Sequence, residues 1–233
     1  MFAKFFLKFN HLIQKCFKPL EKMLFLKPCY YQLEKIGSQY GGWVVPTGLI
    51  KPTAICYCAG VGEDITFDLG IIERFSCQVF AFDPTPRAKK YVEKTVSKNP
   101  KFNFYDIGLW SQDSRQKFFV PSNPRYVSHS IVNLKGTKKF FEARCKRLST
   151  IMQGLNHEKI DLLKIDIEGA EHEVLQSIVE DELDIKVICV EFEPMSYFKI
   201  FGTILKLISQ QYSLVNIDGS NYTFIKNKYF QLT

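Results

Sequence analysis

The feature that most constrains the fold is an apolar run that ends in acidic residues and a glycine, Asp161 to Glu171 (Asp-Leu-Leu-Lys-Ile-Asp-Ile-Glu-Gly-Ala-Glu). Its apolar and β-branched residues predict a buried strand over Asp161–Ile165, and Gly169 allows a sharp turn into a helix that starts at Ala170. Charged side chains are costly inside a core, so we expect those at the end of this strand to serve a site. In open α/β sheets, ligands bind at the carboxyl edge of the strands. The block therefore predicts both a sheet and the position of its site.

Length and composition are those of an ordinary globular protein. The 233 residues fit one large domain or one domain with a short appendage, and 46% are hydrophobic and 24% charged. The seven cysteines are odd in number and scattered, which is typical of reduced, buried thiols in a cytoplasmic protein rather than of a disulfide framework. Cys56 and Cys58 lack the spacing of a zinc site. The carboxylates of Asp166, Glu168 and Glu191 are of the type that binds Mg²⁺, but nothing in their spacing demands a metal, so we predict no metal centre.

From Thr53 onward, strand-like and helix-like segments alternate, which predicts an α/β fold with a doubly wound, mostly parallel sheet covered by helices on both faces. A turn at Asp218 to Ser220 joins the last two strands into a hairpin, so one strand must be antiparallel. The seven expected strands are Ala54–Ala59, Gln78–Phe82, Phe102–Tyr105, Asp161–Ile165, Lys186–Phe192, Tyr212–Ile217 and Tyr222–Lys226.

The amino-terminal segment differs in character from the rest of the chain. Six lysines but a single acid, Glu21, fall before Cys29 among many phenylalanines, and they account for much of the net charge of +7. We interpret residues 1–36 as a basic amphipathic helical segment. It either makes peripheral contact with a membrane surface or a partner, or packs its phenylalanine face on the domain. Its lysines interrupt every apolar run, which argues against a membrane span or a secretory signal. Residues 37–233 then form the main domain, with an irregular insertion at about 110–147.

A glycine loop follows the first of these strands and opens a helix. Gly60 and Gly62 allow a tight turn and a close approach to a ligand, and Asp83 ends the next strand, where an acid can accept both ribose hydroxyls. This pattern favours an adenosine-bearing ligand. NAD prefers a third glycine where Ile65 stands, whereas S-adenosylmethionine has no phosphate and does not need one. After the third strand, Asp106 is placed to bond the adenine amino group, with Ile107 and Leu109 packing on the purine.

Three blocks together resemble the FkbM family of S-adenosylmethionine-dependent methyltransferases. They are Ala59 to Ile65, Val79 to Pro86 (Val-Phe-Ala-Phe-Asp-Pro-Thr-Pro) and Leu162 to Glu171, and the likeness runs from about Tyr40 to Lys226. The resemblance implies a Rossmann-like class I methyltransferase fold and methyl transfer, usually to a hydroxyl of a sugar, glycan or small natural product.

The sequence departs from the class I pattern at one point. Many of these enzymes carry an acid two residues before the first loop glycine, where this chain has Cys58. Glu63 or Asp64 would then hold the amino group of the donor instead.

An alcohol acceptor needs a base, because hydroxyls are poor nucleophiles at neutral pH. We expect Asp166 and Glu168 to orient or deprotonate the acceptor and Lys164 to hold a carboxylate or a polar substrate group. Strand alternation puts Lys164 and Asp166 on one face, so a structural ion pair is the competing interpretation. Glu171 is either part of this catalytic set or a cap of the following helix. His129, in the insertion, is an alternative base.

Two other functions remain open at this point: an NAD-dependent oxidoreductase, and a catalytically silent binding or adaptor module that uses the basic amino-terminal segment. Nucleic acid is not expected as a substrate, because basic residues gather in the amino-terminal segment and the helix from Arg87 rather than among aromatics along the domain. The expected acceptor is a small molecule or carbohydrate. Glu191 and Glu193 end the fifth strand beside it, or cap a loop.

Overall fold

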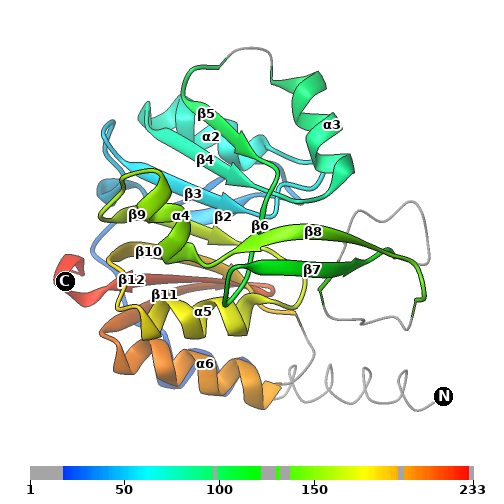
Figure 1. Ribbon diagram of the computed structural model, residues 1–233. Helices are drawn as coiled ribbons and strands as arrows, with labels where there is room; N and C mark the ends of the chain where they lie inside the picture. Colours follow the sequence, from blue (N-terminus) through cyan, green and yellow to red (C-terminus); the bar gives the residue numbers. More distant parts are fainter. Residues whose placement is uncertain (1–17, 97–98, 122–129, 132–136, 194–196, 231–233) are drawn as a thin grey trace.

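The computed structural model is built around a seven-stranded sheet (Figure 1). It describes all residues except 1–17, 97–98, 122–129, 132–136, 194–196 and 231–233. The strand order is β11-β12-β10-β9-β3-β4-β5, and every strand is parallel to its neighbours except β12, which pairs antiparallel with β10 and β11. The strands are β3 (Ile55–Ala59), β4 (Gln78–Phe82), β5 (Phe102–Tyr105), β9 (Ile160–Ile165), β10 (Ile185–Glu191), β11 (Tyr212–Asp218) and β12 (Asn221–Lys226). The α/β sheet with a carboxyl-terminal hairpin predicted from the sequence is confirmed.

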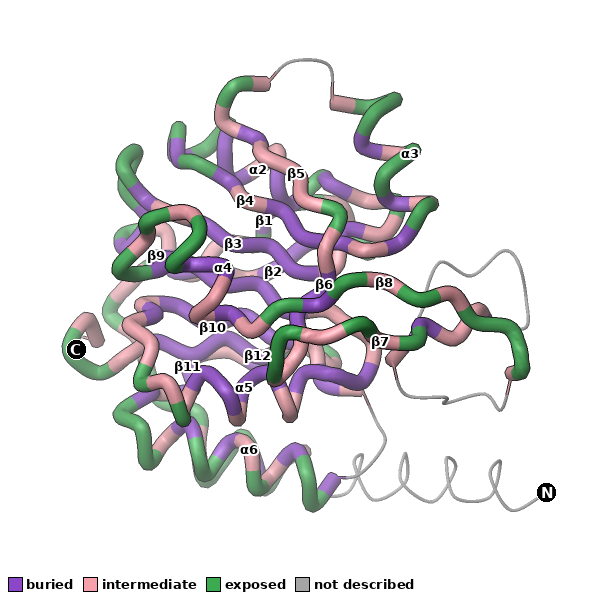
Figure 2. Tube along the Cα trace, in the orientation of Figure 1, coloured by how far each residue is buried: buried purple, intermediate pink, exposed green. Residues whose placement is uncertain are grey.

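Helices cover both faces of the sheet because its central strands are apolar on both sides. On β3, Cys56 and Cys58 point into one core, and Tyr57 and Ala59 point into the other. The first core is shared with α2 (Thr66–Phe75) and α3 (Pro86–Thr95), and the second with α4 (Leu148–Gly154), α5 (Glu171–Glu180) and α6 (Tyr197–Ser209). Figure 2 shows the resulting buried strands between more exposed helices.

The structure differs from the sequence prediction near the amino terminus. Residues 18–25 are helical, as expected, but Leu33–Ile36 forms strand β1, which pairs antiparallel with β2 (Trp43–Pro46). Ile36 and Trp43 face each other in this pair and are buried in the first core, and this burial favours a strand there. Short 3₁₀ turns lie at Thr47–Leu49 and Asn227–Tyr229. No helix in the described part of the chain combines the length and hydropathy needed to cross a membrane.

The predicted insertion contains a small sheet of its own. Strand β8 (Phe140–Lys146) pairs antiparallel with β7 (Ser114–Phe119) and parallel with the short β6 (Gly108–Leu109). Phe118 and Phe141 stack with ring centroids 5.4 Å apart, and Phe118 is buried. This hairpin extends beside the carboxyl edge of the main sheet (Figure 1).

Candidate active site

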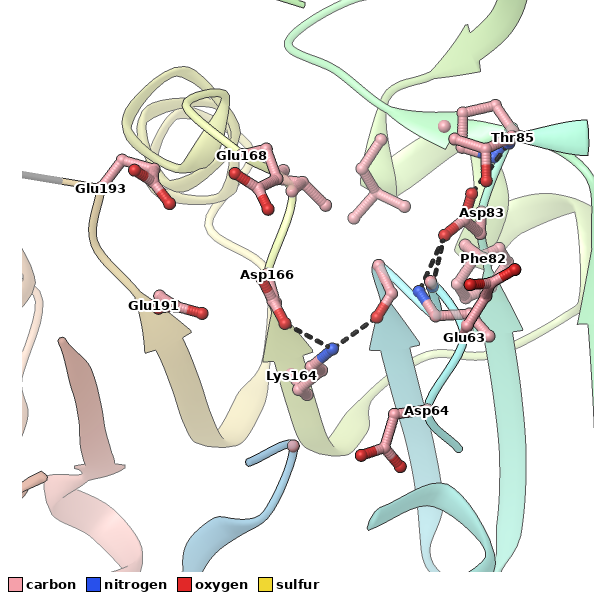
Figure 3. A pocket seen from close by; sticks show the side chains of 18 of the residues that line it. Glu63, Asp64, Phe82, Asp83, Thr85, Lys164, Asp166, Glu168, Glu191 and Glu193 are labelled. Atoms are coloured by element: carbon pink, nitrogen blue, oxygen red, sulfur yellow. Dashed lines mark hydrogen bonds and ion pairs between the residues drawn. The ribbon is translucent and has the colours of Figure 1, made fainter. Parts of the chain in front are cut away.

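One large cavity, about 800 Å³, opens at the carboxyl edge of the sheet. It is lined by the segments that follow β3, β4, β9 and β10, by the loop before β2 and by the inner side of the β7–β8 hairpin. Figure 3 shows the glycine-loop side and the acidic side of this cavity facing each other. The two groups of residues singled out in the sequence, far apart along the chain, therefore share one space.

The glycine loop after β3 passes very close to the acidic segment after β9. A side-chain carbon on Gly60, whose φ is +84°, would lie 1.7 Å from the carbonyl oxygen of Asp166, so only glycine fits there. The Asp166 amide in turn donates to the carbonyl of Ala59 at 3.0 Å. Gly62, with a φ of +56°, turns the loop toward α2. Both predicted glycines line the cavity.

Asp83 holds the shape of this glycine loop. Its Oδ2 accepts hydrogen bonds from the backbone amides of Val61 and Gly62, both at 2.9 Å, and its Oδ1 accepts from the amide of Thr85 at 2.8 Å. Asp83 is buried and lines the cavity. Each carboxylate oxygen can accept two hydrogen bonds, so Oδ1 keeps one acceptor position. The residue predicted to bind ribose thus also fixes the loop beside it.

Glu63 and Asp64 both line the cavity, and both already have protein partners. Glu63 accepts two hydrogen bonds from the Arg87 guanidinium, at 2.6 and 3.2 Å. Asp64 accepts from the hydroxyl of Ser38 at 2.6 Å and from the amide and hydroxyl of Thr66. Partial burial alone would raise the pKa of Asp64, but these hydrogen bonds outweigh it and lower that pKa. Asp64 is therefore an anion that ties the loop before β2 to the start of α2.

Asp106 and Ile107 do not line the cavity. Asp106 is half exposed and forms an ion pair with Lys89, 3.0 Å from Oδ2 to Nζ. The next two residues, Gly108 and Leu109, line the cavity instead. Apolar contacts for a purine are therefore available from Leu109, together with Phe82 and Phe118.

Lys164 connects the two sides of the site. It is 5% exposed, donates to the carbonyl of Gly60 and lies 3.2 Å from Oδ2 of Asp166. Its ammonium also sits 5.6 Å from the ring centre of Trp43. Burial alone would lower the pKa of Lys164, but the negative charges of Asp166 and Asp68 outweigh it and raise that pKa. The Lys164–Asp166 ion pair considered from the sequence is confirmed, and both of its residues line the cavity.

Four carboxylates line the acidic side of the cavity: Asp166, Glu168, Glu191 and Glu193 (Figure 3). Asp166 and Glu191 are neighbours, because they directly follow the paired residues Ile165 and Val190 of β9 and β10. Burial, and then the charge and hydrogen bond of Asp166, raise the pKa of Glu191 well above its ordinary range. This raised pKa favours the protonated form of the Glu191 carboxyl. Within the described ranges, no three His, Cys, Asp or Glu side chains are arranged to hold a metal ion.

Glu171 is turned away from the cavity. It is 1% exposed, does not line the cavity, and accepts a hydrogen bond from the Gly169 amide at 2.8 Å. Burial raises the pKa of Glu171 to about 8. This bond closes the turn between β9 and α5, in which Glu168 and Gly169 adopt φ values of +55° and +101°. The geometry gives Glu171 a role in shaping the turn that carries Glu168.

Several lining residues were assigned no role from the sequence. Tyr40 and Gly41 reach the cavity from the loop before β2, Trp43 reaches it from the first position of β2, and Asn221 from the start of β12. The Gly41-Gly-Trp43 block belongs to the resemblance to the FkbM family, whereas no local pattern indicated Asn221. His129, the alternative base, lies outside the described residues, although Ile131, further along the insertion, lines the cavity.

Comparisons with known proteins identify the family. The model of the "Methyltransferase FkbM domain" matches residues 59–214, which span the glycine loop, the acidic strand end and most of the sheet. No curated protein matches this chain.

Three solved structures illustrate the similarity of the fold. The Methanococcus jannaschii fibrillarin pre-rRNA processing protein is 9% identical over 79% of this chain and 70% of its own, with a TM-score of 0.47. A putative rRNA methylase from Clostridium thermocellum is 9% identical over 77% and 90%, also at 0.47. Aeropyrum pernix fibrillarin, solved with natively bound S-adenosyl-L-methionine, is 10% identical over 76% and 66%, at 0.42.

These matches contradict the expectation that nucleic acid plays no part, because fibrillarins and rRNA methylases stand among the similar structures. That exclusion relied on the distribution of basic residues along the sequence, which does not report how they gather in space. Identities of 9 to 13% assign no RNA substrate to this chain either.

The family match also resolves the enzyme class left open by the sequence. It replaces the oxidoreductase and silent-module alternatives with a methyltransferase that uses S-adenosylmethionine, and the strand order is that of the Rossmann-like class I fold. With its glycine loop, its β4 acid and its acidic β9 end gathered around one cavity, this chain belongs to the FkbM methyltransferase family.

Proposed function

We propose that this enzyme transfers a methyl group from S-adenosylmethionine to a hydroxyl of a sugar, glycan or small natural product. The observation that carries the proposal is the shared cavity, in which the Gly60–Gly62 loop and Asp83 face Asp166 and Glu191. One side has the groups a nucleoside needs, and the other has the groups that a hydroxyl needs to lose its proton.

The glycine-loop side fits the donor. Asp83 keeps a free acceptor position for a ribose hydroxyl, and Phe82, Leu109 and Phe118 supply apolar surface for the purine. The donor carries a positive sulfonium and ammonium, which the surrounding carboxylates complement. When bound, it supplies an electrophilic methyl group for an in-line displacement.

The acidic side fits a hydroxyl acceptor. The carboxylate oxygens of Asp166 and Glu191 lie side by side and can accept the proton of the acceptor hydroxyl, so the pair acts as the base once Glu191 is ionised. Lys164 keeps Asp166 in place through its ion pair and its bond to the glycine loop. Glu168, held in the left-handed region by the turn, orients the acceptor.

The donor and the acceptor are tested separately. Calorimetric titration with S-adenosylmethionine, S-adenosylhomocysteine and NAD should show binding of the first two, and tight NAD binding alone would contradict the donor assignment. Labelled-methyl transfer is then measured on monosaccharides, glycans, hydroxylated metabolites and RNA oligonucleotides. Label in ether-linked methyl groups on sugars or small molecules supports the proposal. Label confined to base nitrogens of RNA would refute it.

We further propose that the enzyme works in the cytoplasm. The six cysteines in the described residues are all free thiols, and five of them are buried.

A further inference from the structure

The helical segment at residues 18–25 buries an acid and exposes several apolar side chains. Its inward face carries Glu21, the only acid that precedes Glu34 in the sequence, and this side chain is fully buried. Leu20, Met23 and Leu24, in contrast, are exposed by 41%, 73% and 49%. A helix that packs against a domain normally buries its apolar residues and exposes its charges. The exposed apolar side chains of this helix are therefore suited to contact an apolar surface outside this domain.

This helix is firmly attached to the body of the protein. Phe25 makes an edge-to-face contact with Phe201 of α6, with ring centroids 5.1 Å apart. The Lys27 amide donates to the carbonyl of Leu214 at 2.8 Å, and the Lys18 ammonium donates to the carbonyl of Gly219. The helix is thus presented by the fold as a surface feature beside α6.

Helix α6 continues the exposed apolar surface. Phe198 and Leu205 are exposed by 76% and 45%, and with Phe201 they follow a spacing of three and four residues that places them on one side of α6. Since Phe201 contacts Phe25, that side of α6 adjoins the first helix. We call Leu20, Met23, Leu24, Phe198 and Leu205 the two-helix patch. Large exposed apolar patches mark interaction sites rather than ordinary surface.

The charges around the two-helix patch indicate what kind of partner binds there. Lys22 and Lys27 are exposed on and just after the first helix, and the sequence before Glu34 holds six lysines and no acid other than the buried Glu21. The sequence that precedes this helix continues the same mixture of phenylalanine, leucine and lysine. A second copy of the chain would bring like charges together, whereas an anionic bilayer would take up both the apolar side chains and the lysines.

We propose that the two-helix patch docks this enzyme on anionic lipid bilayers. The apolar side chains enter the boundary between headgroups and acyl chains, and the lysines contact the anionic headgroups. This inference does not depend on the acceptor proposed above, because it concerns a different surface. If the enzyme is active but does not bind vesicles, only the docking proposal is refuted.

The test is cosedimentation of the full chain with vesicles of phosphatidylcholine alone and of phosphatidylcholine with phosphatidylserine. We expect binding to the anionic vesicles that weakens with salt, and little binding to the neutral ones. Met23→Ser with Phe198→Ser should weaken binding more than tenfold, whereas Phe140→Ser, which alters an exposed phenylalanine on the β7–β8 hairpin, should not change it.

A charge test complements the apolar one. Lys22→Glu with Lys27→Glu should lower binding at least tenfold, because each lysine near an anionic surface contributes about fivefold (~1 kcal/mol). Lys90→Glu with Lys94→Glu, on the exposed side of α3, is the matched control. Unchanged far-ultraviolet circular dichroism and unchanged S-adenosylhomocysteine affinity show that a variant is folded.

Three outcomes would overturn the proposal. Equal binding to neutral and anionic vesicles would remove the electrostatic argument. A patch variant that binds vesicles normally, while substitution of Phe5, Phe6 and Phe9 abolishes binding, would assign docking to the preceding segment alone. A patch variant that converts a dimer into a monomer in sedimentation velocity, with no vesicle binding by the native chain, would make the patch an interface between copies.

Discussion

Replacing Glu171 by glutamine should make the protein more stable at alkaline pH. Glu171 is 1% exposed; one carboxyl oxygen accepts from Gly169, and the other is buried with no hydrogen-bond partner among the described residues. Burial raises the pKa of this carboxyl from 4.5 to about 8. Glutamine has nearly the same shape and keeps an acceptor for the Gly169 amide, but it cannot ionise.

The sign and the size of this change in stability follow from proton linkage. Between about pH 4.5 and about pH 8 the folded protein keeps the Glu171 proton that the unfolded chain has lost. Native stability therefore falls as the pH rises through this window, by up to about 1.4 kcal/mol per pH unit, and levels off above it. The ceiling is about 5 kcal/mol, and local relaxation and water entry should reduce the observed gain of Glu171→Gln to about 2–3 kcal/mol at alkaline pH. Near pH 4.5 the variant should match the native protein within about 1 kcal/mol.

The assay is urea unfolding followed by circular dichroism at several pH values from about 5 to about 9. Glu182→Gln, at an exposed position just after α5, serves as the control for loss of one negative charge and should leave the native pH dependence unchanged. The stability of Glu171→Gln could instead show the same dependence on pH as that of the native protein, or the variant could be most destabilised at the alkaline end. Either result would mean that Glu171 is ionised in the folded protein, and the argument from burial would fail.

Four further substitutions test the site. Asp83→Asn should weaken S-adenosylhomocysteine binding at least tenfold in calorimetry, because it removes the charge that holds two loop amides (about 1.5–3 kcal/mol per charged hydrogen bond); unchanged affinity would reject the ribose assignment. Asp166→Asn should lower kcat by about 10²- to 10⁴-fold with donor affinity retained. In the native enzyme we expect kcat to rise as the pH passes the raised pKa of Glu191, and Glu191→Gln should abolish this rise. Full activity in both variants would exclude the pair as the base. Gly60→Ala should destabilise the fold by about 2 kcal/mol or more and impair donor binding, whereas Gly219→Ala, which has a similar positive φ and open space, should show only the conformational strain of about 1 kcal/mol; equal losses would mean that the contact with Asp166 is unimportant.

Much of the fold could be predicted because short-range patterns carry it. Strand and helix alternation, the hairpin at Asp218 to Ser220 and the glycine loop at Gly60 are each encoded by neighbouring residues. Two regions were exceptions. Leu33–Ile36 was expected to be helical and is a strand, because it pairs with β2 across an intervening loop and no local pattern indicates that pairing. The insertion was expected to be irregular and contains the paired strands β7 and β8.

The sequence by itself determined the family, the sheet and the edge at which the site lies, since a strand that ends in Asp166 must place that acid at the carboxyl edge. The tertiary structure decided which acids share the cavity. Parallel pairing of β9 with β10 sets Glu191 beside Asp166, Glu171 at the start of α5 is buried, and Asp106 pairs with Lys89 at the surface. The physical reason is that residue spacing specifies local geometry, whereas the protonation state and exposure of a carboxyl group depend on neighbours that are distant in the chain.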